Sequence, residues 1–194
     1  GSSSGHACGN HSPCVDGGGD AVKRGVAAAC AWLVLAGVSP LPPVNDALIL
    51  GDALPPNLSA FSMGFADGKP TNFGISPYSL RNPLFSDYAE KFRFAYLPRG
   101  KKIGYRSEGL LDFPVGSVLV KSFGYPSDFR KPEGRFKMIE TRLLVHRASG
   151  WVALPYVWNA DGTDATLKRA GTRLDVAWTH HDGKPRVISY AVPN

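Results

Sequence analysis

Cysteine is scarce in this sequence and confined to one end of it. The chain has 194 residues but only three cysteines, and all of them lie at or before position 30. They are Cys8, Cys14 and Cys30. The rest of the sequence therefore excludes a disulfide, a thiolate metal site and a thiol nucleophile.

Recognisable catalytic motifs are also missing. The sequence has no G-x-S-x-G elbow, no glycine-rich phosphate loop before a helix and no carboxylate pair at a telling spacing. It matches no nucleic-acid-binding motif, and the cations behind its formal charge of +6 are interrupted by apolar and acidic residues. We expect no nucleic-acid partner and no catalytic activity in this chain alone. We interpret the scattered positive charge as a solvated basic face and not as a binding surface for acidic partners.

Long hydrophobic runs are absent as well. The apolar run at 25–38 is shorter than a membrane span, which needs about 20 residues. It follows Lys23 and Arg24, the layout of a secretory signal peptide. Residues 22–38 therefore predict export to the periplasm or beyond, with no stable membrane span once the signal is removed. An uncleaved anchor and a buried helix remain the alternatives. Residues 1–21, rich in glycine and serine, are interpreted as a disordered leader or extension.

Turn-forming residues, in contrast, are abundant. The 22 glycines and 16 prolines favour many short strands over long helices. The clearest pattern is a hairpin at 139–158. Ile139, Thr141, Leu143 and Val145 alternate on one core-facing side, a turn follows at Ser149-Gly150, and 151–158 is rich in β-branched and aromatic residues.

Further strands are predicted around this hairpin. They fall at 92–97, 102–106, 110–113, 117–123, 165–169, 173–179 and 187–192, with a two-residue turn at Asp182-Gly183 before the last of them. In that last strand Ile188, Tyr190 and Val192 share one face. Short helices are predicted at 47–50 and within 82–91, the latter capped by Ser86. The fold class is therefore mainly β: an antiparallel sandwich or barrel-like domain at 92–194, behind an irregular Pro/Gly-rich region at 39–91.

Two clusters are candidates for a ligand or partner surface. Trp151, Tyr156 and Trp158 could form an aromatic platform for a sugar ring or a haem edge, although core packing is the favoured interpretation. His180 and His181 stand beside Asp182, and these are metal-ligand residue types. Adjacent residues of a strand point to opposite faces, however, and Asp182 already has a turn role. We therefore expect no metal site.

Seven phrases of the sequence resemble a known family. They are PLFSDYA at 83–89, LPRGKK at 97–102, DFPVGSV at 112–118, IETRLL at 139–144, GW at 150–151, YVWN at 156–159 and TDA at 163–165. In this order and spacing they resemble the non-haem N-terminal region of exported bacterial diheme c-type cytochromes. The resemblance covers residues 75–194.

The resemblance implies a β-rich accessory domain that stands beside a haem domain in an exported electron-transfer protein. In that family a Val-Pro-Asn phrase leads into a Cys-x-x-Cys-His haem motif, whereas here the same phrase closes the sequence. The motif occurs nowhere in this chain, so no residue of it is expected to bind a cofactor. The resemblance therefore implies haem c only outside this chain. The haem would belong either to a downstream domain, in which case the chain is truncated before it, or to a separate haem-bearing subunit.

The predicted function is accordingly that of a non-catalytic accessory or docking domain of an exported, cytochrome-linked redox system. One alternative is a carbohydrate-binding sandwich in which Trp151, Tyr156 or Trp158 stacks on a sugar. The other is a hydrolase that uses His181 and Asp182.

Overall fold

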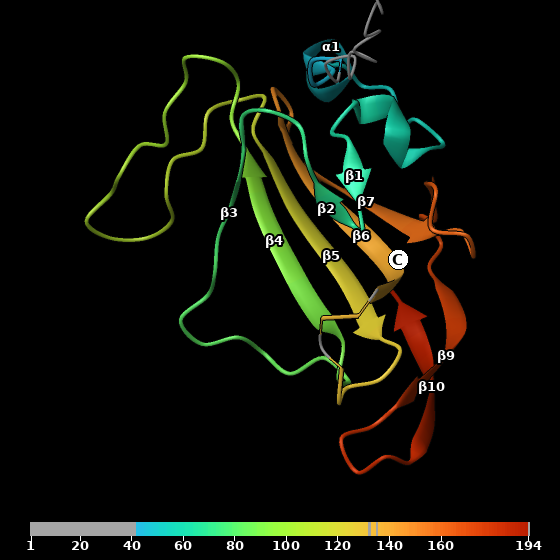
Figure 1. The fold of residues 1–194 in the computed structure, drawn as a ribbon. Helices are drawn as coiled ribbons and strands as arrows, with labels where there is room; N and C mark the ends of the chain where they lie inside the picture. Colours follow the sequence, from blue (N-terminus) through green and yellow to red (C-terminus); the bar gives the residue numbers. More distant parts are fainter. Residues whose placement is uncertain (1–41, 132, 135, 194) are drawn as a thin grey trace, which may run out of the picture. The chain divides into compact units, whose positions relative to one another are not determined.

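The computed structural model describes residues 42–131, 133–134 and 136–193. The predicted leader at 1–21 and the signal-like segment at 22–38 lie outside the described residues. The described chain is mainly antiparallel β, which confirms the predicted fold class (Figure 1).

The main element is a six-stranded sheet in the order β3-β4-β5-β6-β7-β8. Its strands are β3 (Ile75–Pro77), β4 (Glu90–Tyr96), β5 (Val118–Pro126), β6 (Phe136–Arg147), β7 (Gly150–Trp158) and β8 (Ala165–Leu167). Every neighbouring pair is antiparallel, and β3 and β8 form the two edges, so the sheet is open and not closed into a barrel. The predicted hairpin is confirmed as β6 and β7.

Four smaller elements precede the sheet and one hairpin follows it. The first group consists of α1 (Asp46–Leu50), the 3₁₀ helix η1 (Leu58–Phe61), β1 (Phe65–Ala66) and β2 (Lys69–Pro70). The hairpin consists of β9 (Thr172–Thr179) and β10 (Pro185–Val192), which pair with each other along their whole length, while Thr179 also bridges to Asp128. The turn predicted at Asp182-Gly183 joins them, and Gly183 has φ +78°, a conformation that favours glycine. The short helix predicted at 47–50 is confirmed as part of α1.

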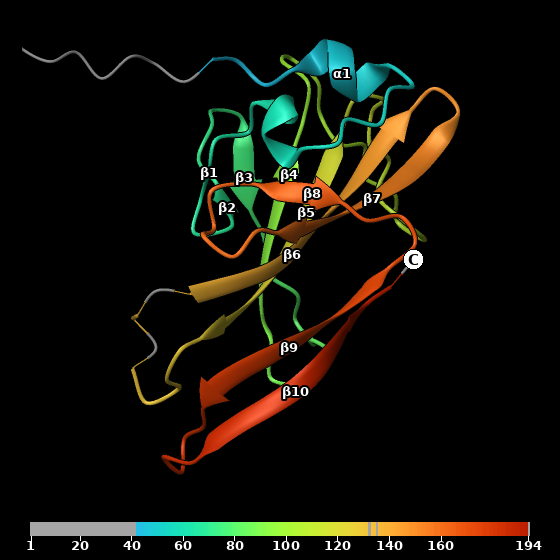
Figure 2. The same ribbon diagram turned by 90° about the vertical axis from the view of Figure 1, so that its right-hand side faces the viewer.

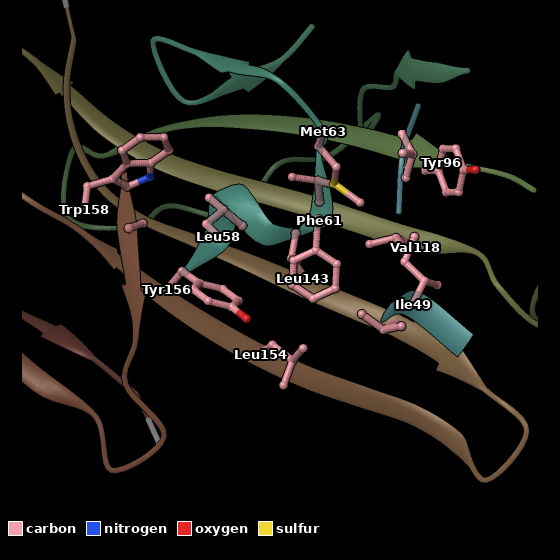
Figure 3. Packing of buried hydrophobic residues seen from close by; sticks show 14 of the residues in the cluster. Ile49, Leu58, Phe61, Met63, Tyr96, Val118, Leu143, Leu154, Tyr156 and Trp158 are labelled. Atoms are coloured by element: carbon pink, nitrogen blue, oxygen red, sulfur yellow. The ribbon is translucent and has the colours of Figure 1, made fainter. Parts of the chain in front are cut away.

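The first face of the large sheet is buried by the N-terminal elements. Figure 3 shows Leu58, Phe61 and Met63 packed against Leu143 and Tyr156 of the sheet. All five side chains are at most 1% exposed, and this apolar burial is the main stabilising contribution of the cluster. The predicted irregular region at 39–91 therefore provides the layer that packs on this face of the sheet.

Within the described part of the chain, β9 and β10 cover one end of the second face. Figure 2 shows this hairpin as a separate layer beside the sheet. Phe123 and Val157 of the sheet pack there against Val176, Trp178 and Tyr190 of the hairpin. The predicted common face of the last strand is confirmed, since Ile188, Tyr190 and Val192 all belong to this cluster.

A β-bulge corrects one part of the predicted hairpin. Ile139 does not share the face of Thr141, because the β5–β6 register shifts between Phe123 and Gly124. Glu140 stands opposite Phe123 and Met138 opposite Gly124, so Ile139 is the extra residue. Ile139 packs in the second-face cluster and Met138 in the first.

Three predicted elements are wrong. The strands at 102–106 and 110–113 are replaced by a loop with a single bridge, Gly104 to Asp112. Two of their apolar side chains are left largely in solvent, since Tyr105 is 85% exposed and Leu110 is 89% exposed. The helix predicted within 82–91 is absent, and Asp87 and Tyr88 in this segment adopt left-handed φ angles of +46° and +67°.

Candidate functional site

Half of the second sheet face is not covered by any of the residues that the structure describes, and two cross-strand rows of side chains lie there. Residues directly opposite each other in antiparallel strands lie on the same face. Arg93 of β4, Lys121 of β5 and Arg142 of β6 stand opposite one another, and we call them the basic row. Leu119 of β5, Leu144 of β6 and Ala153 of β7 form the apolar row two residues further along. Together with Trp151, these two rows make the open half-face.

The apolar row and Trp151 are accessible to solvent. Leu144 is 37% exposed and Trp151 is 41% exposed, while Ala153 is also exposed and Leu119 is half-buried. Trp151 stacks on His146 directly across the strand pair, with ring centroids 4.4 Å apart and planes 8° from parallel. Phe113 meets the indole edge-on at 5.8 Å. The tryptophan is thus held in place while part of its surface remains free.

A buried carboxylate lies beneath the basic row. Glu140 is fully buried and accepts two hydrogen bonds from Arg142, one from Nε at 3.0 Å and one from Nη2. It also accepts a hydrogen bond of 2.6 Å from the hydroxyl of Tyr190. The charge of Arg142 is therefore compensated, and its guanidinium is fixed in orientation.

The other two cations of the row are not compensated in this way. None of the ion pairs found among the described residues involves Arg93 or Lys121. Burial lowers the pKa of Lys121, and the positive charges of Arg93, Arg142 and Lys91 lower it further, against an opposing effect of Glu140. The Nζ of Lys121 lies 4.7 Å from the ring centre of Phe123. The sheet thus holds like charges side by side on a partly desolvated surface.

A pocket of about 350 Å³ adjoins the open half-face. Two arginines, one on β6 and one in the segment after β8, line it together with apolar residues. The lining residues are Arg142, Arg169, Ala153, Leu154, Pro155 and Pro193. The pocket can accommodate an anionic group with an apolar stem, since cations and hydrocarbon surface meet there.

The aromatic residues predicted as a platform do not come together on the surface. Tyr156 is fully buried and donates a 2.9 Å hydrogen bond to the carbonyl of Pro55. Trp158 is 9% exposed, and its Nε1 donates to the hydroxyl of Thr141 at 2.9 Å. Both belong to the first-face core, as the core-packing alternative predicts. Only Trp151 of the three is exposed, and one face of its ring is occupied by His146.

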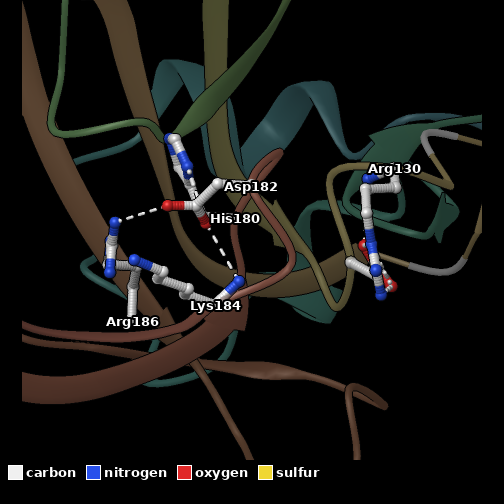
Figure 4. A network of polar contacts seen from close by, with 6 residues as sticks. Arg130, His180, Asp182, Lys184 and Arg186 are labelled. Atoms are coloured by element: carbon white, nitrogen blue, oxygen red, sulfur yellow. Dashed lines mark hydrogen bonds and ion pairs between the residues drawn. The ribbon is translucent and has the colours of Figure 1, made fainter.

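The two predicted histidines lie at the end of β9, apart from the open half-face. Figure 4 shows Asp182 between Lys184 and Arg186. Its carboxylate accepts hydrogen bonds of 2.9 Å from each of them, and the bond from the Lys184 amide is the main cause of its lowered pKa. His180 Nδ1 is 3.4 Å from Asp182, and the His181 ring packs on Phe129 at 5.1 Å.

The carboxylate of Asp182 is thus engaged by the turn itself, as the turn role predicted for it requires. Within the described part of the chain, no group of three or more His, Cys, Asp or Glu side chains is placed to hold a metal ion. The same residues contain no helix whose length and apolar character would allow it to cross a membrane.

Sequence reasoning missed the basic row. Arg93, Lys121 and Arg142 are single cations in strands that otherwise alternate as expected, and they are separated by 28 and 21 positions. The only local signal is a charged residue flanked by core residues, as in Phe92-Arg93-Phe94. Strand register is needed to place the three side by side.

No protein-family model, no curated protein and no solved structure matches this chain.

Proposed function

We propose that this chain is a non-catalytic accessory domain that docks through its open half-face onto a haem-bearing domain or subunit of an exported electron-transfer protein. The observation that carries the proposal is the half-covered second face, where the apolar row and Trp151 remain exposed beside three cations.

The composition of the open half-face supports docking over simple solvation. The water-facing side of an antiparallel sheet ordinarily alternates to polar residues. Here Leu119, Leu144 and Ala153 occupy neighbouring strands in one row, and Trp151 lies next to them. Protein interfaces combine an apolar centre with tryptophan and arginine anchors and a polar rim. The open half-face has each of these parts.

The rigidity of the open half-face also favours binding. β5, β6 and β7 are hydrogen-bonded to neighbours on both sides, so the side chains of the two rows are held in fixed relative positions. A surface that is already ordered loses little conformational entropy when a partner binds. This rigidity favours docking whatever the identity of the partner.

The haem-bearing nature of the partner is supported by the sequence resemblance to exported c-type cytochromes. This chain contains no Cys-x-x-Cys-His motif, and the described residues do not fit covalent haem attachment. The haem would therefore belong to the partner, where it would supply electron transfer. The residues of the open half-face would contact and orient the partner's protein surface.

The first test is to express the coding region with its native downstream sequence in a haem-maturing host and to record a reduced-minus-oxidised visible spectrum. We expect the α band of a c-type cytochrome. The haem-bearing part, produced separately, should then bind the present chain, and Leu144→Glu should lower that affinity at least about tenfold by placing a charge in the apolar row.

Val187→Glu is the matched control for this variant. Val187 is 69% exposed and lies on β10, outside the open half-face, so its substitution should leave binding unchanged. The proposal is overturned if the expressed product is colourless and no separate haem protein binds the chain. It is equally overturned if Leu144→Glu and Val187→Glu bind the haem-bearing part alike.

A further inference from the structure

We infer that the pocket between Arg142 and Arg169 is a subsite for a carboxylate side chain of the docking partner. This inference rests on the proposed docking function and adds a location and a ligand chemistry to it. The two arginines come from different elements, β6 and the segment that follows β8, and the pocket joins the open half-face at Arg142 and Ala153.

Arg142 is prepared to bind a further anion. Among the described residues its hydrogen bonds are made by Nε and Nη2, both to Glu140, while Nη1 makes none. An arginine carries five N–H donors in a rigid plane, so fixing one edge of the guanidinium on Glu140 also fixes the direction of the remaining donors. The side chain is 34% exposed and thus accessible.

The charge around the pocket favours an anion. Arg93, Lys121 and Arg169 take part in none of the ion pairs found among the described residues. Glu140 partly offsets the lowered pKa of Lys121, but its carboxylate is already engaged by Arg142 and Tyr190. An incoming anion would relieve the repulsion between like charges that the strand register imposes.

The walls of the pocket indicate which anion fits. Ala153, Pro155 and Pro193 present mainly hydrocarbon, and the two prolines offer no backbone N–H group. A glutamate side chain brings a planar carboxylate, which arginine binds in a bidentate manner, and an aliphatic stem, which suits the hydrocarbon walls. The pocket volume of about 350 Å³ leaves space for such a side chain. An acidic residue on the partner is therefore the ligand that these walls and charges suit.

The test uses the full chain, labelled with ¹⁵N, and a blocked hexaglutamate peptide as the probe. We expect amide shifts that saturate with peptide concentration and centre on Ala153 and Arg169. Arg169→Gln should weaken peptide binding about fivefold, because one cation is lost from a partly desolvated site. Arg169 is exposed, so this variant should fold, and the dispersion of its amide spectrum checks that it does.

Lys168→Gln is the matched control, since Lys168 is an exposed neighbouring cation that does not line the pocket. It should change the affinity less than twofold, as expected for a screened surface charge. Equal losses in the two variants would reveal diffuse attraction and overturn the inference. Amide shift changes spread over all basic residues would also overturn the inference. The same holds if inorganic phosphate binds as tightly as the peptide.

The outcome is separable from that of the docking proposal. If hexaglutamate does not bind but the haem-bearing part still docks in a Leu144-dependent manner, the subsite is wrong and the docking function stands. If the peptide binds at the pocket and no haem-bearing protein docks, the anion site stands while its assignment to a haem-bearing partner fails.

Discussion

The hydroxyl of Tyr190 donates a 2.6 Å hydrogen bond to the carboxylate of Glu140, 50 positions earlier in the chain. This bond connects β10 to β6, and the same carboxylate orients Arg142. One buried acidic group therefore links the hairpin that covers half of the second face to the basic row on the other half. The covered and open halves of this face are consequently coupled, and the first predictions follow from that coupling.

Tyr190→Phe should lower the free energy of unfolding by about 1.5–3 kcal/mol, the usual contribution of a hydrogen bond to a charged group. Tyr190 is 6% exposed, so water cannot replace the lost donor freely. Urea denaturation of the variant and the parent measures the effect. Tyr105→Phe is the control, because Tyr105 is 85% exposed and should be neutral. A loss below about 0.5 kcal/mol would contradict the importance of this bond.

Stability should decrease as the pH rises above about 10, the ordinary pKa of tyrosine. Burial raises the pKa of Tyr125 to about 12, and burial followed by the hydrogen bond to Glu140 raises the pKa of Tyr190. Between the unfolded and folded pKa values the unfolded chain has lost protons that the folded chain retains, so a rising pH favours unfolding.

Urea denaturation between pH 9 and pH 12 should show this loss, with a shallower slope for Tyr190→Phe than for the parent. The comparison of slopes is informative because the lowered pKa of Lys121 acts in the opposite direction in both proteins. Parallel slopes would contradict the raised pKa of Tyr190.

Arg147→Met should loosen the N-terminal cover of the first face. Arg147 is 4% exposed and donates hydrogen bonds to the carbonyls of Ile49, at 3.3 Å, and Ala53, at 2.9 Å. Methionine preserves most of the apolar stem but leaves both carbonyls without this donor, at a cost of about 2 kcal/mol. Hydrogen exchange should accelerate most at the amides of α1. Uniform acceleration that includes β9 and β10 would argue against a local tether.

Lys121→Met should stabilise the chain at neutral pH by about 0.5 kcal/mol, because it removes a like charge from between two others. The lowered pKa of Lys121 means that keeping this side chain charged costs free energy in the folded chain. This cost is present at neutral pH and disappears as the pH approaches about 10.5. Thermal denaturation at pH 7 and at pH 10.5 should therefore show a gain only at the lower pH.

Lys137→Met serves as the comparison for this prediction, since Lys137 lies on the neighbouring strand β6, opposite Tyr125 of β5 and not opposite another cation. It should give no gain at either pH. An equal gain in both variants would show that the general positive charge of the chain, and not the basic row, is responsible.

The sequence predicts the site less completely than the fold. Trp151 could be identified from its place after a turn, in an aromatic-rich strand. Tyr156 and Trp158 look equivalent to it in the sequence, but both are buried because the N-terminal elements cover their end of β7. The basic row has no local signature, since its members meet only through the register of three strands.

The sequence by itself determined the antiparallel β class, the β6–β7 and β9–β10 hairpins and the common face of Ile188, Tyr190 and Val192. These depend on alternation and turn chemistry, which act between residues close in the chain. Only the tertiary structure decided that β9 and β10 cover half of one face, that a bulge turns Ile139 to that face and that Arg142 lies beside Lys121. The physical reason is that layer coverage and register depend on contacts between distant segments, where burial outweighs local preference.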